Sequence, residues 1–178
     1  MAADLTGVTI RAAVPGDAAA LEELGQRTFL EKFGHLYAKA DLDTYLEEAH
    51  AQTFYAHMID SPDYLVRLAA LPDGALGAYL VCSPLELPAD DAKEGAVELM
   101  RLYVDTPLQG RGLGSHFIGE AVDWAKISRA PELYLSVFSE NEDARRLYER
   151  HGFEKVGEFD FPVGNHLDLE FLMRLKLE

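Results

Sequence analysis

The sequence lacks the features that mark secreted and membrane proteins. It contains one cysteine, Cys82, so it can form no internal disulfide, which suits a reducing compartment. No apolar run approaches the ~18 residues that a membrane-spanning helix needs, and the first residues lack the basic start and apolar core of a secretory signal. We therefore expect a cytoplasmic protein without a membrane partner, in which Cys82 is an inert core thiol.

Basic residues are also scarce. The chain has 16 Lys and Arg residues against 31 Asp and Glu residues, a formal net charge of -15. This charge repels a phosphate backbone, so we expect no nucleic-acid partner. It favours cationic substrates, although most exposed acids only keep a protein soluble.

Easily recognised metal and hydrolase motifs are missing. The six histidines include no pair spaced by four residues and have no cysteine partner, so we predict no metal site. Neither a Gly-x-Ser-x-Gly elbow nor a Ser-His-Asp order is present. What the chain does have is a hydrophobic fraction of 48% over 178 residues, which predicts one domain over residues 1–178 with a full core.

The most informative segment is a glycine-rich turn. Residues 97–104 favour a strand, Pro107 ends strand pairing because it has no amide to donate, and apolar residues from Phe117 recur at helical spacing. Free amides and the positive end of a helix therefore converge on one spot, which predicts a phosphate or pyrophosphate site. The turn reads Gln109-Gly110-Arg111-Gly112-Leu113-Gly114 and is followed by Ser115.

Several interpretations of this turn compete. A P-loop would need a lysine that Gly114-Ser115-His116 lacks, and a dinucleotide-binding fingerprint would need a third glycine where Ser115 stands. A plain glycine-rich connection is the structural alternative, because glycine turns alone are weak signals. The turn resembles the Q/R-x-x-G-x-G/A loop of the GNAT superfamily of N-acetyltransferases, which Gln109, Gly112 and Gly114 fit without a mismatch.

A second block supports that resemblance. Residues 132–138 favour a strand, and Asn141 then stands as the N-cap of a helix that Gly152 closes. The pattern Asn-x-x-Ala-x-x-Leu-Tyr-x-x-x-Gly-Phe closely resembles the second conserved block of the same superfamily. Two blocks in this order and separation are far more specific than either alone, so the resemblance extends over residues 10–177.

The resemblance implies the GNAT fold, which is an α/β (α+β) architecture. It consists of a mixed central sheet of about six to seven strands flanked by about four helices. The sequence places strands at 8–11, 64–70, 74–82, 97–104, 132–138, 155–161 and 167–177, and helices at 18–33, 41–59, after 112 and at 142–151.

The resemblance also implies acetyl-CoA as co-substrate, with no metal. Its pyrophosphate would lie on the amides of the turn, and its pantetheine arm would pair like an extra strand with the end of the preceding strand, where Pro107 ends the ladder. Asn141 caps its helix and would also touch the pantetheine arm. The implied cofactor-binding residues are Leu102, Tyr103, Val104, Gln109, Gly110, Arg111, Gly112, Leu113, Gly114, Ser115 and Asn141.

Two residues are candidates for catalysis of direct attack by an amine on the thioester. Tyr148 matches the usual general acid of the family, with an ordinary pKa near ~10, and its structural alternative is a core aromatic. Glu98 matches the position of a base that acts through water. Strand alternation would put it on the face of Met100, Leu102 and Val104, and its structural alternative is a salt bridge or a surface position.

The acceptor is predicted from partial signals. Thr28-Phe29-x-x-x-Phe33 and Phe159-x-Phe161-x-x-Gly164 resemble bacterial spermidine/spermine acetyltransferases. Acids cluster in the segment that shapes the acceptor pocket in this superfamily, at Glu31, Asp41, Asp43, Glu47 and Glu48. We expect a small cationic amine such as a polyamine.

Two alternatives stay open. One is a degenerate, non-catalytic domain that binds acyl-CoA as a regulatory module, and the other is a protein N-terminal or lysine acetyltransferase. The sequence leaves the oligomeric state open, with a homodimer among the options.

Overall fold

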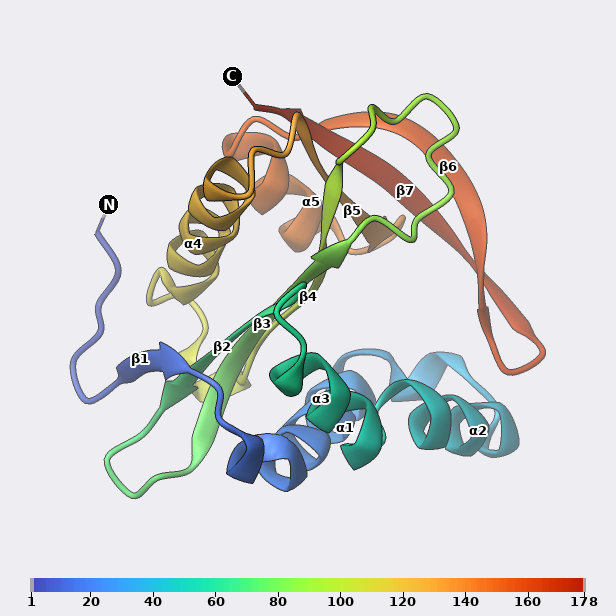
Figure 1. The fold of residues 1–178 in the computed structure, drawn as a ribbon. Helices are drawn as coiled ribbons and strands as arrows, with labels where there is room; N and C mark the ends of the chain where they lie inside the picture. The colour runs from blue at the N-terminus through green and yellow to red at the C-terminus, as the bar shows by residue number, and fades with distance from the viewer. Residues whose placement is uncertain (1, 178) are drawn as a thin grey trace.

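A seven-stranded mixed sheet forms the centre of the molecule (Figure 1). The structure is a computed structural model that describes residues 2–177. The strand order is β1-β2-β3-β4-β5-β7-β6, and every neighbouring pair is antiparallel except β4 and β5. The predicted fold class is confirmed. The strands are β1 (Thr9–Ala12), β2 (Leu65–Ala70), β3 (Leu76–Pro84), β4 (Val97–Val104), β5 (Glu132–Phe138), β6 (Glu154–Val163) and β7 (His166–Lys176).

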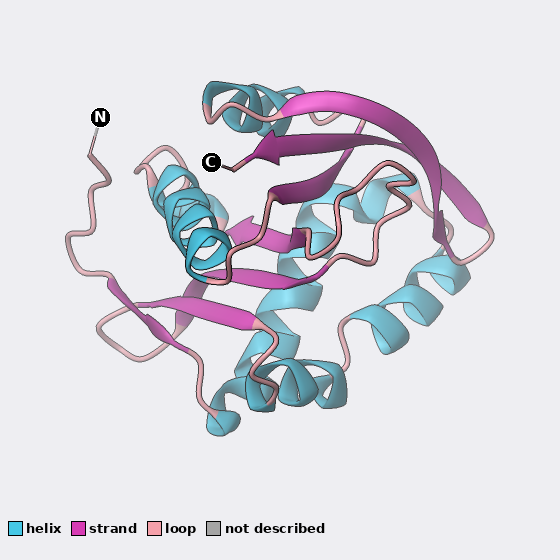
Figure 2. Cartoon of the chain, turned by 45° about the horizontal axis from the view of Figure 1, so that its top comes forward, coloured by secondary structure: helices cyan, strands magenta, loops and turns pink. Residues whose placement is uncertain are grey.

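Helices cover the sheet on both faces (Figures 1 and 2). Leucine, phenylalanine and alanine side chains of α4 pack on one face together with α5, and α1 and α3 bury a second apolar cluster on the other. The α-helices of the described residues are α1 (Ala18–Phe33), α2 (Lys39–Ala49), α3 (Gln52–Asp60), α4 (Leu113–Ile127) and α5 (Glu142–Arg150). Short 3-10 turns occupy Pro15–Asp17, Gly34–Leu36 and Thr106–Leu108.

The predicted helix over residues 41–59 is wrong in one respect, because it is two helices. Ala51 is extended, with φ -70° and ψ 147°, and separates α2 from α3. His50 turns inward at this break, is 1% exposed, and its Nδ1 lies 2.8 Å from the Tyr55 hydroxyl. Burial lowers the pKa of His50 to about 2, so the ring is neutral.

Strands β4 and β5 separate after a short parallel stretch. They pair only at Val97 with Leu133 and at Glu98 with Tyr134. Beyond that point, the β5-side edge of β4 has no strand partner within residues 2–177. A parallel pair that opens in this way leaves a gap in the middle of the sheet, with backbone amides and carbonyls available along one side.

A β-bulge in β4 changes which residues share a face. Arg101 pairs with Val81 whereas Leu99 pairs with the next residue of β3, so Met100 is the extra residue. Leu102 therefore packs with the α4 cluster, as Leu99 does. Glu98 shares the opposite face with Met100 and Tyr103, so the prediction that it shares a face with Leu102 and Val104 is wrong.

The only cysteine is in the core, as predicted. Cys82 is fully buried, and burial raises the pKa of its thiol. Among the described helices, none is both long and apolar enough to cross a bilayer.

Candidate active site

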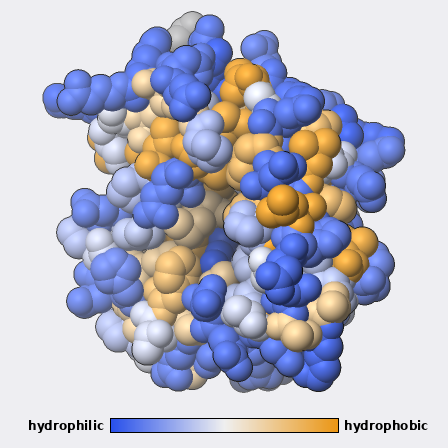
Figure 3. Space-filling model, turned by 90° about the vertical axis from the view of Figure 1, so that its right-hand side faces the viewer, coloured by the Kyte–Doolittle hydropathy of each residue, from blue (hydrophilic) through white to orange (hydrophobic). Residues whose placement is uncertain are grey.

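A cavity of about 1170 Å³ opens at the gap between β4 and β5. One wall is β4 from Glu98 to Val104, and another is β5 from Ser136 to Phe138. Residues of α1, α2, α3, α4, α5, β6 and β7 also line it, so both faces of the sheet contribute. Figure 3 shows a hollow on the corresponding side of the molecule, with apolar and hydrophilic residues around it.

The glycine-rich turn lies at one end of this cavity. Gly110 and Gly112 have φ of 75° and 83°, in the left-handed region that glycine tolerates. Gly112 is the N-cap of α4 and offers no side-chain acceptor to the first-turn amides. A Cβ atom on Gly112 would lie 2.9 Å from Cα of Ala3, so only glycine fits here. The predicted residues that line the cavity here are Gln109, Gly110, Gly112, Leu113, Gly114 and Ser115.

Arg111 is the exception among the predicted residues of the turn. It does not line the cavity. Its guanidinium donates to the Thr6 carbonyl at 2.6 Å, and its Nε lies 3.6 Å from an oxygen of Asp4. Its side chain therefore holds the N-terminal segment rather than facing the cavity.

The end of β4 offers an unpaired edge beside the turn. Leu102, Tyr103 and Val104 line the cavity as predicted. Their ladder with β3 continues as far as Val104, so the free edge arises because β5 diverges and not because Pro107 ends the ladder, as the sequence suggested. The Gln109 side chain donates to the Val104 carbonyl at 3.0 Å and ties the turn to the strand.

Helix α5 brings two predicted residues to the same cavity. Asn141 caps the helix, its side-chain oxygen accepting from the Ala144 amide at 3.5 Å, and it lines the cavity. Tyr148 also lines the cavity, is 8% exposed, and its hydroxyl makes no hydrogen bond to any residue from 2 to 177 that the structure records. Burial and the charge of Glu170 raise the pKa of Tyr148. The prediction of an ordinary pKa is therefore wrong, and the phenol is protonated at neutral pH.

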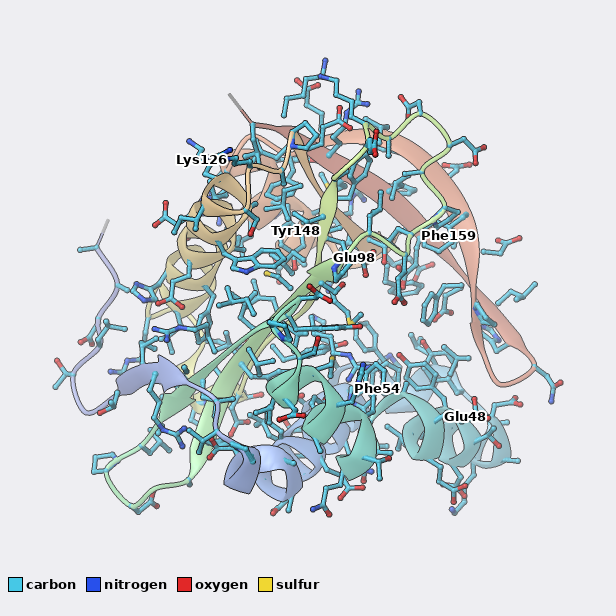
Figure 4. The ribbon with its side chains drawn as sticks, viewed as in Figure 1. Glu48, Phe54, Glu98, Lys126, Tyr148 and Phe159 are labelled. Carbon is cyan, nitrogen blue, oxygen red and sulfur yellow. The ribbon has the colours of Figure 1, made fainter. Side chains whose placement is uncertain are left out.

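Glu98 is buried at the closed end of the gap, where it forms the last pair of β4 with β5. It is 4% exposed, and its Oε2 accepts from the amides of Glu86 and Leu87 at 2.8 and 3.0 Å. It makes no salt bridge with a described residue and is not on the surface, so neither predicted alternative holds. Burial raises its pKa, and the two amide hydrogen bonds partly offset that shift. Glu98 and Tyr148 both lie near the centre of the molecule, beside β4 (Figure 4).

Aromatic rings enclose the part of the cavity away from the turn. The Phe29 ring centroid lies 5.2 Å from that of Phe33 and 4.8 Å from that of Tyr45, and Tyr45 lies 6.1 Å from Phe161. Figure 4 shows Phe159 on the β6–β7 hairpin and Phe54 on α3, on opposite sides of this region. The sequence pointed to the phenylalanines of α1 and β6 but not to Phe54 and Phe138, which line the same cavity, as do Tyr37 and Tyr45.

Acidic residues also line the cavity, but most of them are not those predicted. Of the five predicted acids, only Glu31 lines it. Asp41 accepts from the backbone and side chain of Asn165 at 2.8 and 3.0 Å, and Asp43 pairs with Lys39 at 2.5 Å. Glu47 and Glu48 are exposed outside the cavity.

Sequence reasoning missed two acids of β7, Asp168 and Glu170, which line the acceptor part of the cavity. The sequence of β7 does contain a signal, because its apolar and acidic residues alternate with the apolar ones facing solvent. Leu167 and Leu169 between them are 59% and 41% exposed, whereas Asp168 is 6% exposed. Apolar residues that face solvent while acids face inward indicate a functional surface rather than a core.

A buried arginine fixes the helical wall of the cavity. Arg101 donates to the Tyr55 hydroxyl at 2.9 Å and to the Ala49 carbonyl, the last residue of α2. Its guanidinium lies 4.8 Å from the Phe54 ring centroid. Arg101 thus satisfies a carbonyl at a helix end and ties the α2–α3 junction to β4. No group of three or more potential metal-binding side chains occurs within residues 2–177.

Comparisons with known proteins agree with this geometry. Residues 26–153 match the sequence profile described as "Acetyltransferase (GNAT) family". The spermine/spermidine N(1)-acetyltransferase of Bacillus subtilis is 40% identical over 73 residues, which are 40% of this chain and 48% of that protein. The chain thus aligns with about half the length of this curated relative. An uncharacterized N-acetyltransferase of Lactobacillus delbrueckii subsp. lactis is 24% identical over 97% of this chain and 99% of its own length.

Solved structures share the fold. The PaiA N-acetyltransferase of Thermoplasma acidophilum, solved in complex with coenzyme A, superposes with a TM-score of 0.75 at 19% identity. The match covers 96% of this chain and 99% of that one. Arabidopsis thaliana NAA60, solved with a bisubstrate analogue, gives a TM-score of 0.73 at 20% identity, over 96% of this chain and 99% of that one. At such identities the likeness is one of fold.

Proposed function

Because the chain belongs to the acetyltransferase (GNAT) family, we propose that it transfers an acetyl group from acetyl-CoA to a primary amine by direct attack. One observation carries this proposal. A single cavity joins the glycine-rich turn, the free edge of β4, Tyr148 and an acidic, aromatic chamber. The first two features suit a phosphate-bearing, amide-containing donor, and the chamber suits an amine acceptor.

The donor would bind along the turn and β4. Amides of residues 110–115 would receive the pyrophosphate, because Gly112 leaves the helix N-terminus uncapped and side-chain-free. Leu102, Tyr103 and Val104 would offer their β5-side backbone groups to the pantetheine amides. Gln109 would hold the turn against the strand end, and Asn141 would contact the same arm from α5. Arg111 would contribute its backbone only.

The chemistry needs a proton acceptor for the amine and a proton donor for the thiolate. We propose that Glu98 takes the ammonium proton through a water, since it is buried at the cavity wall with a raised pKa. The amine then attacks the thioester carbonyl, and the carbon–sulfur bond breaks. Tyr148 would donate its proton to the departing thiolate and recover one from the new amide nitrogen, so one proton is released overall. Its raised pKa keeps the phenol protonated until that step.

We propose a small cationic amine, such as a polyamine, as the acceptor. The net charge of -15 creates a field that attracts cations. The chamber combines aromatic rings, which attract cations, with Glu31, Asp168 and Glu170. The name of the Bacillus subtilis relative points to the same substrate class.

A turnover assay with purified protein tests this function. Acetyl-CoA is combined with spermidine, 1,4-diaminobutane, a neutral amine, an amino acid, and peptides with a free N-terminus or lysine, and free thiol is followed. We expect the highest kcat/KM with the polyamines. Preference for a peptide would indicate a protein acetyltransferase. Binding of acetyl-CoA without turnover on any acceptor would indicate a regulatory acyl-CoA-binding domain.

A further inference from the structure

Strand β7 carries its acids toward the cavity and its leucines toward solvent. Asp168 and Glu170 line the cavity, whereas Leu167 and Leu169 are exposed. Side chains on one face of a strand recur every second residue, so the two acids form a short row about 6.8 Å apart along the strand. The strand thus exposes two leucines at an energetic cost while it buries charge.

Aromatic rings on neighbouring strands face this row. In the antiparallel ladder, Phe159 of β6 is the direct partner of Glu170, and Phe161 is the direct partner of Asp168. On the other side, Phe138 of β5 is the partner of Glu170. Directly opposed residues project from the same face of a sheet. Each acid is therefore flanked by a ring, an arrangement that suits a cationic nitrogen joined to methylene groups.

Glu170 has no counter-charge within the described chain. No salt bridge joins it to a lysine, arginine or histidine among residues 2–177. Lys32, Arg101 and Arg150 line the cavity, yet none of them pairs with it. Burial and the charge of Asp168 raise the pKa of Glu170, the direction expected of a carboxylate that lacks a cation. Glu170 is partly buried, and a partly buried carboxylate without a cation is stabilised when a ligand supplies the positive charge.

Asp168 stands further from the gap in the sheet. It accepts a hydrogen bond from the Tyr37 hydroxyl, and its Oδ1 lies 3.1 Å from Nε2 of His166, which is 49% exposed. Glu170, in contrast, is paired with Phe138, the last residue of β5, which borders the gap, and its charge contributes to the raised pKa of Tyr148. Tyr148 is itself a buried residue that lines the cavity, and its hydroxyl makes no hydrogen bond with a described residue. The order from the gap outward is therefore Tyr148, Glu170, Asp168.

We propose that Glu170 and Asp168 bind two successive cationic nitrogens of an acceptor that lies extended along β7. Glu170 holds the ammonium that reacts, and Asp168 holds the next one. Phe159 and Phe161 cover the methylene groups between them. This subsite rests on the proposed acetyltransferase function and assigns its acceptor as a diamine or polyamine with a short aliphatic spacer.

The test compares kcat/KM for 1,4-diaminobutane and 1-aminobutane, which differ by one cationic nitrogen. We expect Glu170→Gln to lower kcat/KM for both amines by about 10- to 100-fold, mainly through KM. Glu170→Asp, which keeps the charge, should recover part of the loss. We expect Asp168→Asn to lower the ratio of diamine to monoamine kcat/KM by about 10-fold. The matched control is Asp160→Asn, which removes the same charge from an exposed position of β6 outside the cavity.

Calorimetric titration of the coenzyme A-bound protein with 1,4-diaminobutane gives a second readout that needs no turnover. Weaker binding by both β7 variants, with wild-type binding by Asp160→Asn, supports the subsite. If the wild-type protein acetylates diamines and the β7 variants keep its affinities and amine ratio, the subsite is wrong while the proposed function stands. Equal losses in Asp160→Asn would attribute the effect to net charge and overturn the subsite. No turnover of any di- or polyamine by the wild-type protein would overturn the subsite and the polyamine acceptor, while turnover of another amine would leave the acetyltransferase function standing.

Discussion

The two ends of the cavity are built in different ways. The donor end comes from two continuous stretches, residues 97–115 and 132–153, in which each strand leads through a short turn into a helix. The acceptor end joins α1 and α2 to the β6–β7 hairpin, which begins more than 100 residues later in the chain. The donor end is determined by interactions between residues that are close in the sequence. The acceptor end is determined by packing between segments that are distant in the sequence. A change at one end should therefore affect one substrate and spare the other.

The strongest separation of the two ends is expected at Gly112. Gly112→Asp places a side chain where φ is 83° and a Cβ would meet Ala3, and it adds negative charge at the proposed pyrophosphate site. We expect acetyl-CoA binding to fall below detection in calorimetry. Gly119→Asp, on the same helix α4, is the matched control, because a Cβ atom there would meet no atom within 4 Å. If Gly112→Asp weakened acetyl-CoA binding by no more than several-fold, this would count against the turn as the phosphate site.

Tyr148 lies where the two ends meet, so its loss should affect chemistry rather than binding. Tyr148→Phe keeps the ring contact with Phe153, whose centroid is 5.9 Å away, and removes the proton donor. We expect kcat to fall by about 10- to 1000-fold, with acetyl-CoA affinity nearly unchanged. Rapid-quench kinetics and calorimetry measure the two quantities. If Tyr148→Phe turned over at the wild-type rate, Tyr148 would be a packing residue and not the proton donor.

Glu98 should give a smaller effect with a pH signature. The carboxylate form is the base, so kcat/KM should rise with pH as Glu98 loses its proton, and burial moves this rise above the usual carboxyl range. Glu98→Gln keeps an oxygen that can accept from the Glu86 and Leu87 amides, so the loop stays in place. We expect about 10- to 100-fold lower kcat/KM and a shallower acid limb, because the proposed subsite carboxylate Glu170 must still lose its proton to bind the ammonium. The exposed Glu94→Gln variant should keep the limb, and an unchanged limb in Glu98→Gln would exclude Glu98 as the base.

The smallest expected effect is that of salt on the acceptor end. The net charge of -15 should steer a polyamine toward the cavity, so kcat/KM for spermidine should fall several-fold as ionic strength rises from about 0.01 to 0.15 M. The value for a neutral amine should change little over the same range. If kcat/KM for both amines depended equally on salt, the net charge would not steer the polyamine toward the cavity.

The contrast between the two ends also explains which parts of the site could be predicted from the sequence. The glycine turn, Asn141 and Tyr148 were predictable because each depends on a few neighbouring residues, such as the cap that Asn141 makes with Ala144. The face of Glu98 was not, since a bulge at Met100 interrupts the alternation and has no composition signal. The break at His50 depends on burial against Tyr55.

The acids of the acceptor end were mistaken for a related reason. The acids of α2 lie in the segment where the family resemblance placed the acceptor pocket. Asp41, however, accepts a hydrogen bond from Asn165 and so holds the tip of the β6–β7 hairpin. Asp168 and Glu170 belong to a strand that sequence analysis treated only as the last strand of the sheet. The reversed alternation of Leu167 and Leu169 with these acids was the one local clue.

The central claim is that donor and acceptor bind at opposite ends of one cavity and meet at the gap between β4 and β5. The most direct measurement is the affinity of a bisubstrate compound, in which the coenzyme A sulfur is joined to spermidine through an acetyl bridge. If both ends bind at once, this compound should bind about 100-fold or more tightly than coenzyme A, and Glu170→Gln should remove most of that gain. An affinity equal to that of coenzyme A alone would contradict the account.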